Sequence, residues 1–99
     1  MSSEEKDPRI TVYVGSRCHF CRMAEALLKA REIPFRVEDA DDPIIRQALV
    51  NRSGWKTIPV IFLDGQLLGG YQELAMADRS GDLGRWLAAS PGDRAEQEK

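Results

Sequence analysis

The chain has 99 residues, which suffices for one small domain with a single modest core. Its composition, 42% hydrophobic and 30% charged, is ordinary for a globular protein and excludes a disordered chain, a collagen-like repeat and a disulfide-dense mini-protein. The 14 basic and 16 acidic residues give a net charge of −2, which argues against nucleic-acid binding because that function usually needs a basic stripe.

Signals for secretion or membrane insertion are not found in the sequence. Residues 1–7 are polar and mostly charged, and no apolar stretch long enough for a signal peptide follows them. No apolar run approaches the roughly 20 residues that a membrane-spanning helix needs. We therefore expect a cytoplasmic protein without a membrane partner. In that compartment Cys18 and Cys21, the two cysteines, indicate redox chemistry or metal binding.

The two ends of the chain differ in composition from its middle. Residues 1–8 are polar, and residues 90–99 lack a bulky apolar side chain, so both are predicted to be flexible tails. Residues 9–89 contain no internal repeat and no linker, and they are predicted to fold as one domain.

The first half of this domain is predicted to alternate strands and helices. Residues 9–14 are rich in β-branched side chains and predict a strand, and residues 35–38 predict another after Pro34. Between these strands, apolar residues at helical spacing predict a helix. They are Phe20, Met23, Ala24, Leu27 and Leu28.

A second helix is predicted to follow the second strand. Asp42 can cap it, Pro43 suits its first turn, and Gly54 suits its end. We expect its apolar side to consist of Ile44, Ile45, Ala48 and Leu49.

The second half is predicted to contain a hairpin and two helices. Residues 58–63 form a nearly continuous apolar run, as expected of a central strand that is buried on both faces. Asp64 and Gly65 predict a hairpin turn. The remaining expected elements are a return strand at 66–68 and helices at 71–79 and 82–89.

This order, β-α-β-α-β-β-α-α, predicts the fold class. The crossover helix makes the first two strands parallel, and the hairpin makes the last two antiparallel. The result is an α/β fold with a four-stranded mixed sheet flanked by helices, of the thioredoxin-like type. Other small α/β domains share the same order of elements, so the motifs decide between them.

The cysteine pair lies where the first helix begins. The free N–H groups and the dipole at a helix N-terminus stabilise a thiolate, and such sites commonly lower the pKa of a cysteine, about 8.5 when free, by one or more units. Arg17 and Arg22 add positive charge nearby. Cys21 follows Cys18 by about one helical turn, so the two sulfurs can meet. The sequence therefore predicts Cys18 as the attacking thiol and Cys21 as the resolving thiol.

Two other roles for the pair are weaker. A zinc site needs two more ligands, and the single histidine, His19, lies between the cysteines and is poorly placed to complete a tetrahedron. The two cysteines could also be inert core residues, but a helix start that follows a glycine and is rich in arginine is a poor setting for a hydrophobic core. His19 itself either stabilises the Cys18 thiolate as a cation or simply faces solvent.

A second group of motifs follows in the later half of the chain. Pro59 is either a simple strand start or a cis-proline that leaves the backbone of Ile58 free to pair with an extended ligand. Gly69 and Gly70 allow a close backbone approach, and the helix that begins near Tyr71 presents N–H groups to a carboxylate. An ordinary turn between strand and helix would have the same glycines.

Taken together, the motifs resemble those of a dithiol glutaredoxin over roughly residues 9–89. They are Cys18-His19-Phe20-Cys21, the stretch 52–62 with Thr57-Ile58-Pro59, the stretch Gly69-Gly70-Tyr71-Gln72-Glu73, and the ending at 81–83. The resemblance implies glutathione-dependent reduction of protein disulfides and of protein–glutathione mixed disulfides. Cys18 would receive the glutathionyl group and a second glutathione would release it. Glutathione is then a co-substrate and no resident metal is expected. The partners are glutathione and disulfide-containing or glutathionylated proteins, and the chain is expected to act as a monomer.

The resemblance also implies which residues contact glutathione. Thr57, Ile58 and Pro59 would pair with its cysteinyl part. Its γ-glutamyl end would lie on the segment Gly70, Tyr71, Gln72 and Glu73, and Arg17 and Phe20 complete the set. Arg46 stands where a polar residue meets the glycine carboxylate, although it could equally be a solvated arginine on a helix face.

Several positions depart from the usual glutaredoxin pattern. Pro and Tyr between the cysteines are replaced by His19 and Phe20, a Lys by Gly15, and a polar residue after the proline by Val60. Glu73 stands where Asp is usual.

Two alternative functions therefore stay open. One is a redoxin that is reduced by thioredoxin reductase and donates electrons to an enzyme such as ribonucleotide reductase, which Trp55 and residues 59–61 favour. The other is a dimer that binds an iron–sulfur cluster through Cys18 and glutathione.

Overall fold

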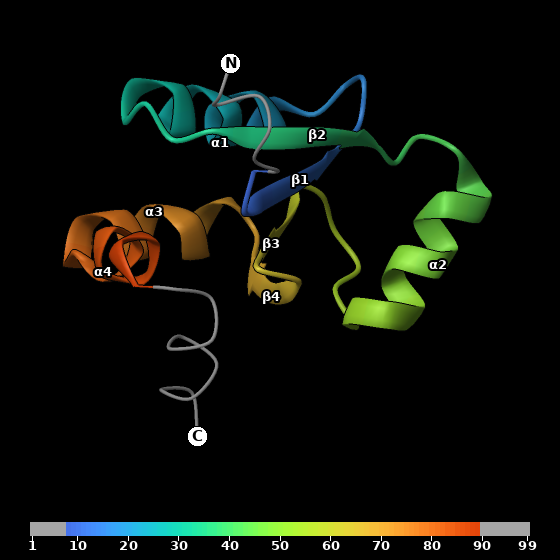
Figure 1. The fold of residues 1–99 in the computed structure, drawn as a ribbon. Coiled ribbons are helices and arrows are strands. Elements are labelled where there is room, and N and C mark those ends of the chain that lie inside the picture. Colours follow the sequence, from blue (N-terminus) through green and yellow to red (C-terminus); the bar gives the residue numbers. More distant parts are fainter. Residues whose placement is uncertain (1–7, 90–99) are drawn as a thin grey trace, which may run out of the picture.

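The computed structural model describes residues 8–89 (Figure 1). The predicted tails, residues 1–8 and 90–99, lie outside this range except for Pro8, so their flexibility stays a prediction. Within the described range, no helix is long and apolar enough to cross a bilayer.

The elements follow the predicted order. They are β1 (Ile10–Val14), α1 (His19–Ala30), β2 (Phe35–Asp39), α2 (Pro43–Ser53), β3 (Val60–Leu63), β4 (Gln66–Gly69), α3 (Tyr71–Ser80) and α4 (Asp82–Ala88). The four strands form one mixed sheet in the order β2-β1-β3-β4. β1 is parallel to β2 and antiparallel to β3, and β3 is antiparallel to β4. The thioredoxin-like fold class is confirmed.

The sheet is covered on both faces. On one face, alternate side chains of β1 and β3 pack against α1, α3 and α4 and form the larger core. On the other face, Val60 and Phe62 pack with Leu49 of α2 and Ala40. In Figure 1, α2 accordingly stands on the opposite side of the strands from α3 and α4. Every residue of β3 is buried, as predicted for a central strand.

The ends of α2 also agree with the prediction. The Asp42 carboxylate accepts a hydrogen bond of 2.8 Å from the Ile44 N–H, and Pro43 occupies the first turn. Gly54 ends the helix with a φ of +74°, a conformation that glycine adopts without steric cost.

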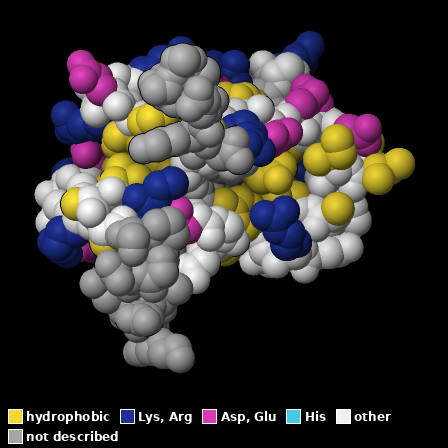
Figure 2. Space-filling view, viewed as in Figure 1, with side chains coloured by type: hydrophobic (Ala, Val, Ile, Leu, Met, Phe, Trp, Pro, Cys, Tyr) yellow, Lys and Arg dark blue, Asp and Glu magenta, His cyan; other side chains and the backbone are white. Residues whose placement is uncertain are grey.

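The predicted apolar side of α2 is wrong in part. Leu49 is buried, but Ile44 is 80% exposed, and Ile45 and Ala48 are also exposed. The helix meets the sheet through its second half, where the Arg52 guanidinium carbon lies 4.4 Å from the centre of the Phe62 ring. Its first turn projects beyond the sheet, and Figure 2 shows hydrophobic side chains at the surface there.

Candidate active site

The two cysteines lie at the junction of β1 and α1. β1 ends at Val14, a short turn follows, and Cys18 is the N-cap residue of α1. Its Sγ accepts a 3.0 Å hydrogen bond from the Cys21 N–H. Cys18 and Cys21 form a disulfide, with their Cα atoms 5.1 Å apart. The capping geometry holds the Cys18 sulfur at the positive end of the helix, as predicted.

Exposure separates the roles of the two sulfur atoms. Cys18 is partly exposed, whereas Cys21 is completely buried in the larger core. An incoming thiol or disulfide can therefore reach Cys18 and not Cys21. As for the zinc alternative, residues 8–89 contain no group of three or more His, Cys, Asp or Glu side chains placed to hold a metal ion.

Arg22 fixes the turn before Cys18. Its guanidinium donates to the Gly15 carbonyl over 3.2 Å and forms an ion pair with Glu25 at 3.3 Å. His19 is exposed, with its ring edge-on to the Phe20 ring. The Phe20 ring in turn lies 5.9 Å from the Tyr71 ring, so Phe20 reaches the start of α3.

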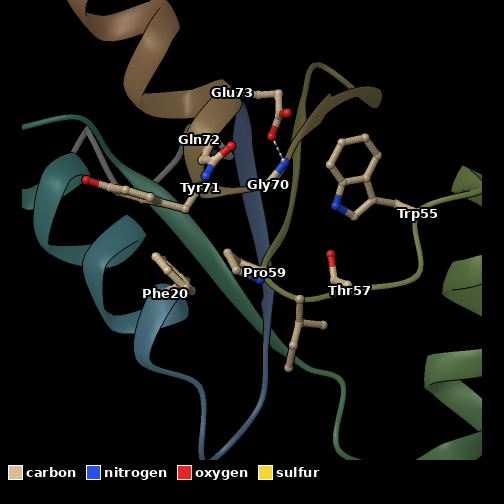
Figure 3. A pocket seen from close by; sticks show the side chains of 9 residues that line it. Phe20, Trp55, Thr57, Pro59, Gly70, Tyr71, Gln72 and Glu73 are labelled. Carbon is tan, nitrogen blue, oxygen red and sulfur yellow. Dashed lines mark hydrogen bonds between the residues drawn. The ribbon is translucent and has the colours of Figure 1, made fainter.

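A cavity of about 430 Å³ lies between Phe20 on α1, the loop that leads into β3, and the first turn of α3 (Figure 3). It is lined by Phe20, Trp55, Thr57, Ile58, Pro59, Gly70, Tyr71, Gln72 and Glu73. Its volume is within the range of small-molecule sites. Three segments that are distant in the sequence thus form one cavity, which Phe20 connects to the helix that carries the cysteine pair.

The loop before β3 forms one side of the cavity. The peptide bond between Ile58 and Pro59 is cis, which confirms that alternative for the proline. The Ile58 side chain fills the space over Gly15: a Cβ atom on Gly15 would lie 2.6 Å from Ile58 Cδ1 and 3.0 Å from Asp41 Oδ1. The position between β1 and Cys18 therefore favours glycine, because any larger residue would displace the Ile58 side chain.

The start of α3 forms the opposite side. Gly69 has a φ of +132°, and Gly70 follows as the N-cap residue of the helix. Glu73 folds back so that its Oε1 accepts a 2.9 Å hydrogen bond from the Gly70 N–H. The next backbone N–H groups of the first helical turn have no helical partner and can receive an anion.

Comparison with known proteins identifies the family. A family model of glutaredoxins matches residues 10–68. The chain belongs to the glutaredoxin family. It is similar to glutaredoxin 3 of Escherichia coli, with 33% identity over 75 residues, which are 75% of this chain and 90% of that protein. It is thus a thiol–disulfide oxidoreductase whose redox pair is Cys18 and Cys21.

Solved glutaredoxin structures have the same fold. A buckwheat glutaredoxin–glutathione complex superposes with a TM-score of 0.76 at 22% identity, over 82% of this chain and 77% of that one. A dithiolic glutaredoxin from Trypanosoma brucei brucei superposes with a TM-score of 0.69 at 29% identity, over 82% of this chain and 88% of that one.

The structure brings most of the predicted glutaredoxin site together. Of the residues expected to contact glutathione, Phe20, Thr57, Ile58, Pro59, Gly70, Tyr71, Gln72 and Glu73 line the cavity. Arg17 and Arg46 do not. Arg17 is exposed, and the Arg46 Nε donates to the Ala40 carbonyl over 2.9 Å, with its guanidinium on the Gly15 side of the loop. For all ten of these residues, the contact with glutathione stays a prediction.

Trp55 is a cavity residue that sequence reasoning did not assign to the site. Its indole ring lines the cavity, and its Nε1 is buried without a hydrogen-bond partner. The sequence offers one signal, an aromatic side chain two residues before Thr57, but an aromatic residue in that place is as readily explained by packing.

Proposed function

We propose that this glutaredoxin uses glutathione as its co-substrate to reduce protein–glutathione mixed disulfides and protein disulfides. The cavity beside the partly exposed Cys18 carries this proposal, because it joins an edge of free backbone, a helix N-terminus and an acidic side chain. Glutathione is an extended tripeptide with a carboxylate at each end and an ammonium group, and its cysteinyl and γ-glutamyl parts have complementary groups in the cavity.

Each end of the cavity suits one part of the tripeptide. The backbone at Thr57 and Ile58 can pair with the cysteinyl residue in the manner of an added strand. The N–H groups of Tyr71 and Gln72 in the first turn of α3 can receive the α-carboxylate of the γ-glutamyl residue. Glu73 holds the Gly70 N–H through Oε1, which leaves its other oxygen for the ammonium group.

Reduction of a mixed disulfide needs Cys18 alone. The Cys18 thiolate attacks the glutathione sulfur, the bond from that sulfur to the substrate protein breaks, and the protein leaves as a thiolate that takes up a proton. A second glutathione thiolate then attacks the glutathione sulfur held on Cys18. Glutathione disulfide leaves, and Cys18 is again a thiolate, which the Cys21 N–H, a donor to this sulfur in the disulfide form, can stabilise.

Reduction of a protein disulfide needs both thiols. Cys18 attacks one substrate sulfur and forms a mixed disulfide while the other substrate sulfur leaves as a thiolate. Cys21 then attacks Cys18, the substrate leaves as a dithiol, and the Cys18–Cys21 disulfide forms, which is the state of this structure. Two molecules of glutathione reduce that disulfide and become one glutathione disulfide. Because regeneration of the dithiol needs a pool of reduced glutathione, we propose that the protein acts in the cytoplasm. We also propose that it acts as a monomer.

The decisive experiment follows NADPH consumption with a glutathionylated peptide as substrate. One reaction contains glutathione and glutathione reductase, and a second contains thioredoxin reductase without glutathione. We expect turnover in the first reaction only. Turnover in the second only would overturn the proposal and indicate an electron donor of the thioredoxin-reductase type.

A further inference from the structure

The indole N–H of Trp55 is a polar group without a partner inside the binding cavity. Among the described residues that are not themselves exposed, it is the one buried side-chain nitrogen or oxygen that makes no hydrogen bond. A buried donor without an acceptor is unfavourable, so such groups in folded proteins usually meet a partner. The ring that carries this donor forms part of the cavity wall.

The donor faces a niche over Gly70. A Cβ atom built on Gly70 would lie 3.4 Å from Trp55 Nε1, 3.5 Å from Glu73 Oε1 and 3.5 Å from the Pro59 carbonyl oxygen. Figure 3 shows the nitrogen edge of the ring turned toward Gly70 and Pro59. Because residue 70 has no side chain, one hydrogen-bond donor and two acceptors, the Glu73 carboxylate and the Pro59 carbonyl, face the same small space.

These groups match an amino acid headgroup. The ammonium group suits the Glu73 carboxylate, and one oxygen of the α-carboxylate suits an N–H donor beside the first turn of α3. Neither requirement is met by a purely apolar or a purely anionic ligand. Because Nε1 is buried, contact with a ligand requires the Trp55 ring to turn toward the niche.

We propose that Trp55 donates its indole N–H to the α-carboxylate of the γ-glutamyl residue and so selects ligands that carry a complete amino acid headgroup. This inference rests on the proposed use of glutathione and adds a specificity-determining residue to it. A hydrogen bond to a charged group corresponds to a preference of about tenfold to a hundredfold.

The first test compares two substrates. One peptide carries glutathione as a mixed disulfide, and the other carries γ-aminobutyryl-cysteinyl-glycine, which lacks only the α-carboxylate. We expect kcat/KM to favour the glutathione form in the unmodified protein. In Trp55→Phe, which keeps an aromatic ring but has no N–H, this preference should fall by about tenfold, since only the glutathione form loses the bond. An unchanged preference in Trp55→Phe would overturn the inference.

A matched control is Trp86→Phe. Trp86 packs against the larger core and does not line the cavity, so the preference should stay as in the unmodified protein. An equal fall in both variants would mean that loss of stability, and not the hydrogen bond, causes the effect, and would also overturn the inference.

A second measurement does not depend on turnover. The Trp55 indole proton is assigned in ¹⁵N-labelled protein by its absence from Trp55→Phe, and S-methylglutathione is titrated. We expect this proton to shift downfield, with a smaller shift for S-methyl-γ-aminobutyryl-cysteinyl-glycine. A shift without turnover would contradict the proposed function and support the role of Trp55. Turnover by glutathione without such a shift would support the proposed function and contradict the role of Trp55. The absence of both turnover and a shift would contradict both proposals.

Discussion

Cys18 and Cys21 differ more in their surroundings than in their chemistry. Cys18 caps a helix at the surface, and Cys21 lies in the core one turn further along. This difference predicts that Cys18→Ser abolishes reduction of both glutathionylated peptides and protein disulfides. Cys21→Ser should keep the first activity and lose the second, because only the second needs a resolving thiol.

Both activities are measured with the same two variants, so that each substrate serves as the control for the other. If Cys18→Ser retained most of the activity, the assignment of Cys18 as the nucleophile would be wrong. Equal loss of both activities in Cys21→Ser would contradict the division of roles.

Gly15 and Ile58 form a second pair, because the Ile58 side chain occupies the space that a side chain at residue 15 would need. The Cβ atom of Gly15→Ala would meet Ile58 Cδ1 at 2.6 Å. Because that methyl group can rotate away, we expect a loss of about 1 kcal/mol in unfolding free energy and a several-fold lower kcat/KM, since Ile58 borders the cavity.

Ile58→Val removes the methyl group concerned and should by itself cost about 0.5–1.5 kcal/mol. The double variant should lose less than the sum of the single variants, which a double-mutant cycle in urea measures. Strict additivity would show that the two side chains do not compete for this space.

At the scale of elements, α2 shows that an apolar side chain and a buried side chain are different things. Leu49 is 3% exposed and Ile44 is 80% exposed, although both stand on the same short helix. We therefore expect Leu49→Ala to lower the unfolding free energy by about 2–4 kcal/mol. Ile44→Ala, the matched control, should change it by no more than about 0.5 kcal/mol. Comparable losses in urea unfolding would mean that the first turn of α2 packs more closely than described.

The same helix explains where prediction from sequence fails. The start and end of α2 depend on Asp42, Pro43 and Gly54, and these act locally, so the sequence suffices to predict them. The side of α2 that is buried depends on its contacts with the sheet, such as that of Arg52 with Phe62, which the helix sequence alone does not show. For the same reason, the position of Arg46 relative to the cavity could not be predicted.

β3 can be predicted from the sequence, whereas the niche at Gly70 cannot. A continuous apolar run bounded by Pro59 and Asp64 has few interpretations, and the central strand was predicted correctly. The niche at Gly70, in contrast, is made by Trp55 and Glu73, which come from two different segments. Only the folded chain shows that these groups face one another.

At the scale of the whole molecule, two arginine–aspartate pairs join parts that are distant in the sequence. Arg9 binds both carboxylate oxygens of Asp64 in the hairpin turn and also donates to the Trp86 and Leu87 carbonyls. Arg31, just after α1, binds both carboxylate oxygens of Asp78 on α3 over 2.8 Å. Both pairs are bidentate, which is the geometry in which an exposed ion pair has most effect.

The second pair predicts a pH dependence of stability. Hydrogen bonds from Arg31 lower the pKa of Asp78 below its ordinary value. The stabilisation is therefore fully present above the pKa of an unfolded Asp, about 3.9, and is lost as the pH falls through the lower pKa of the folded state. Asp78→Asn should melt a few degrees below the unmodified protein at pH 7, and the difference should shrink toward pH 2. A difference that is independent of pH would exclude this carboxylate as its cause.

Because Cys21 is completely buried beside Leu28 and Leu74, the redox centre is also a part of the hydrophobic core. Oxidation and folding then form one thermodynamic cycle. Any packing change that favours the oxidised fold over the reduced fold must lower the reduction potential by the same free energy, about 30 mV for every 1.4 kcal/mol. The reduction potential of this protein can thus be adjusted from the middle of the molecule, by aliphatic side chains that are buried from solvent.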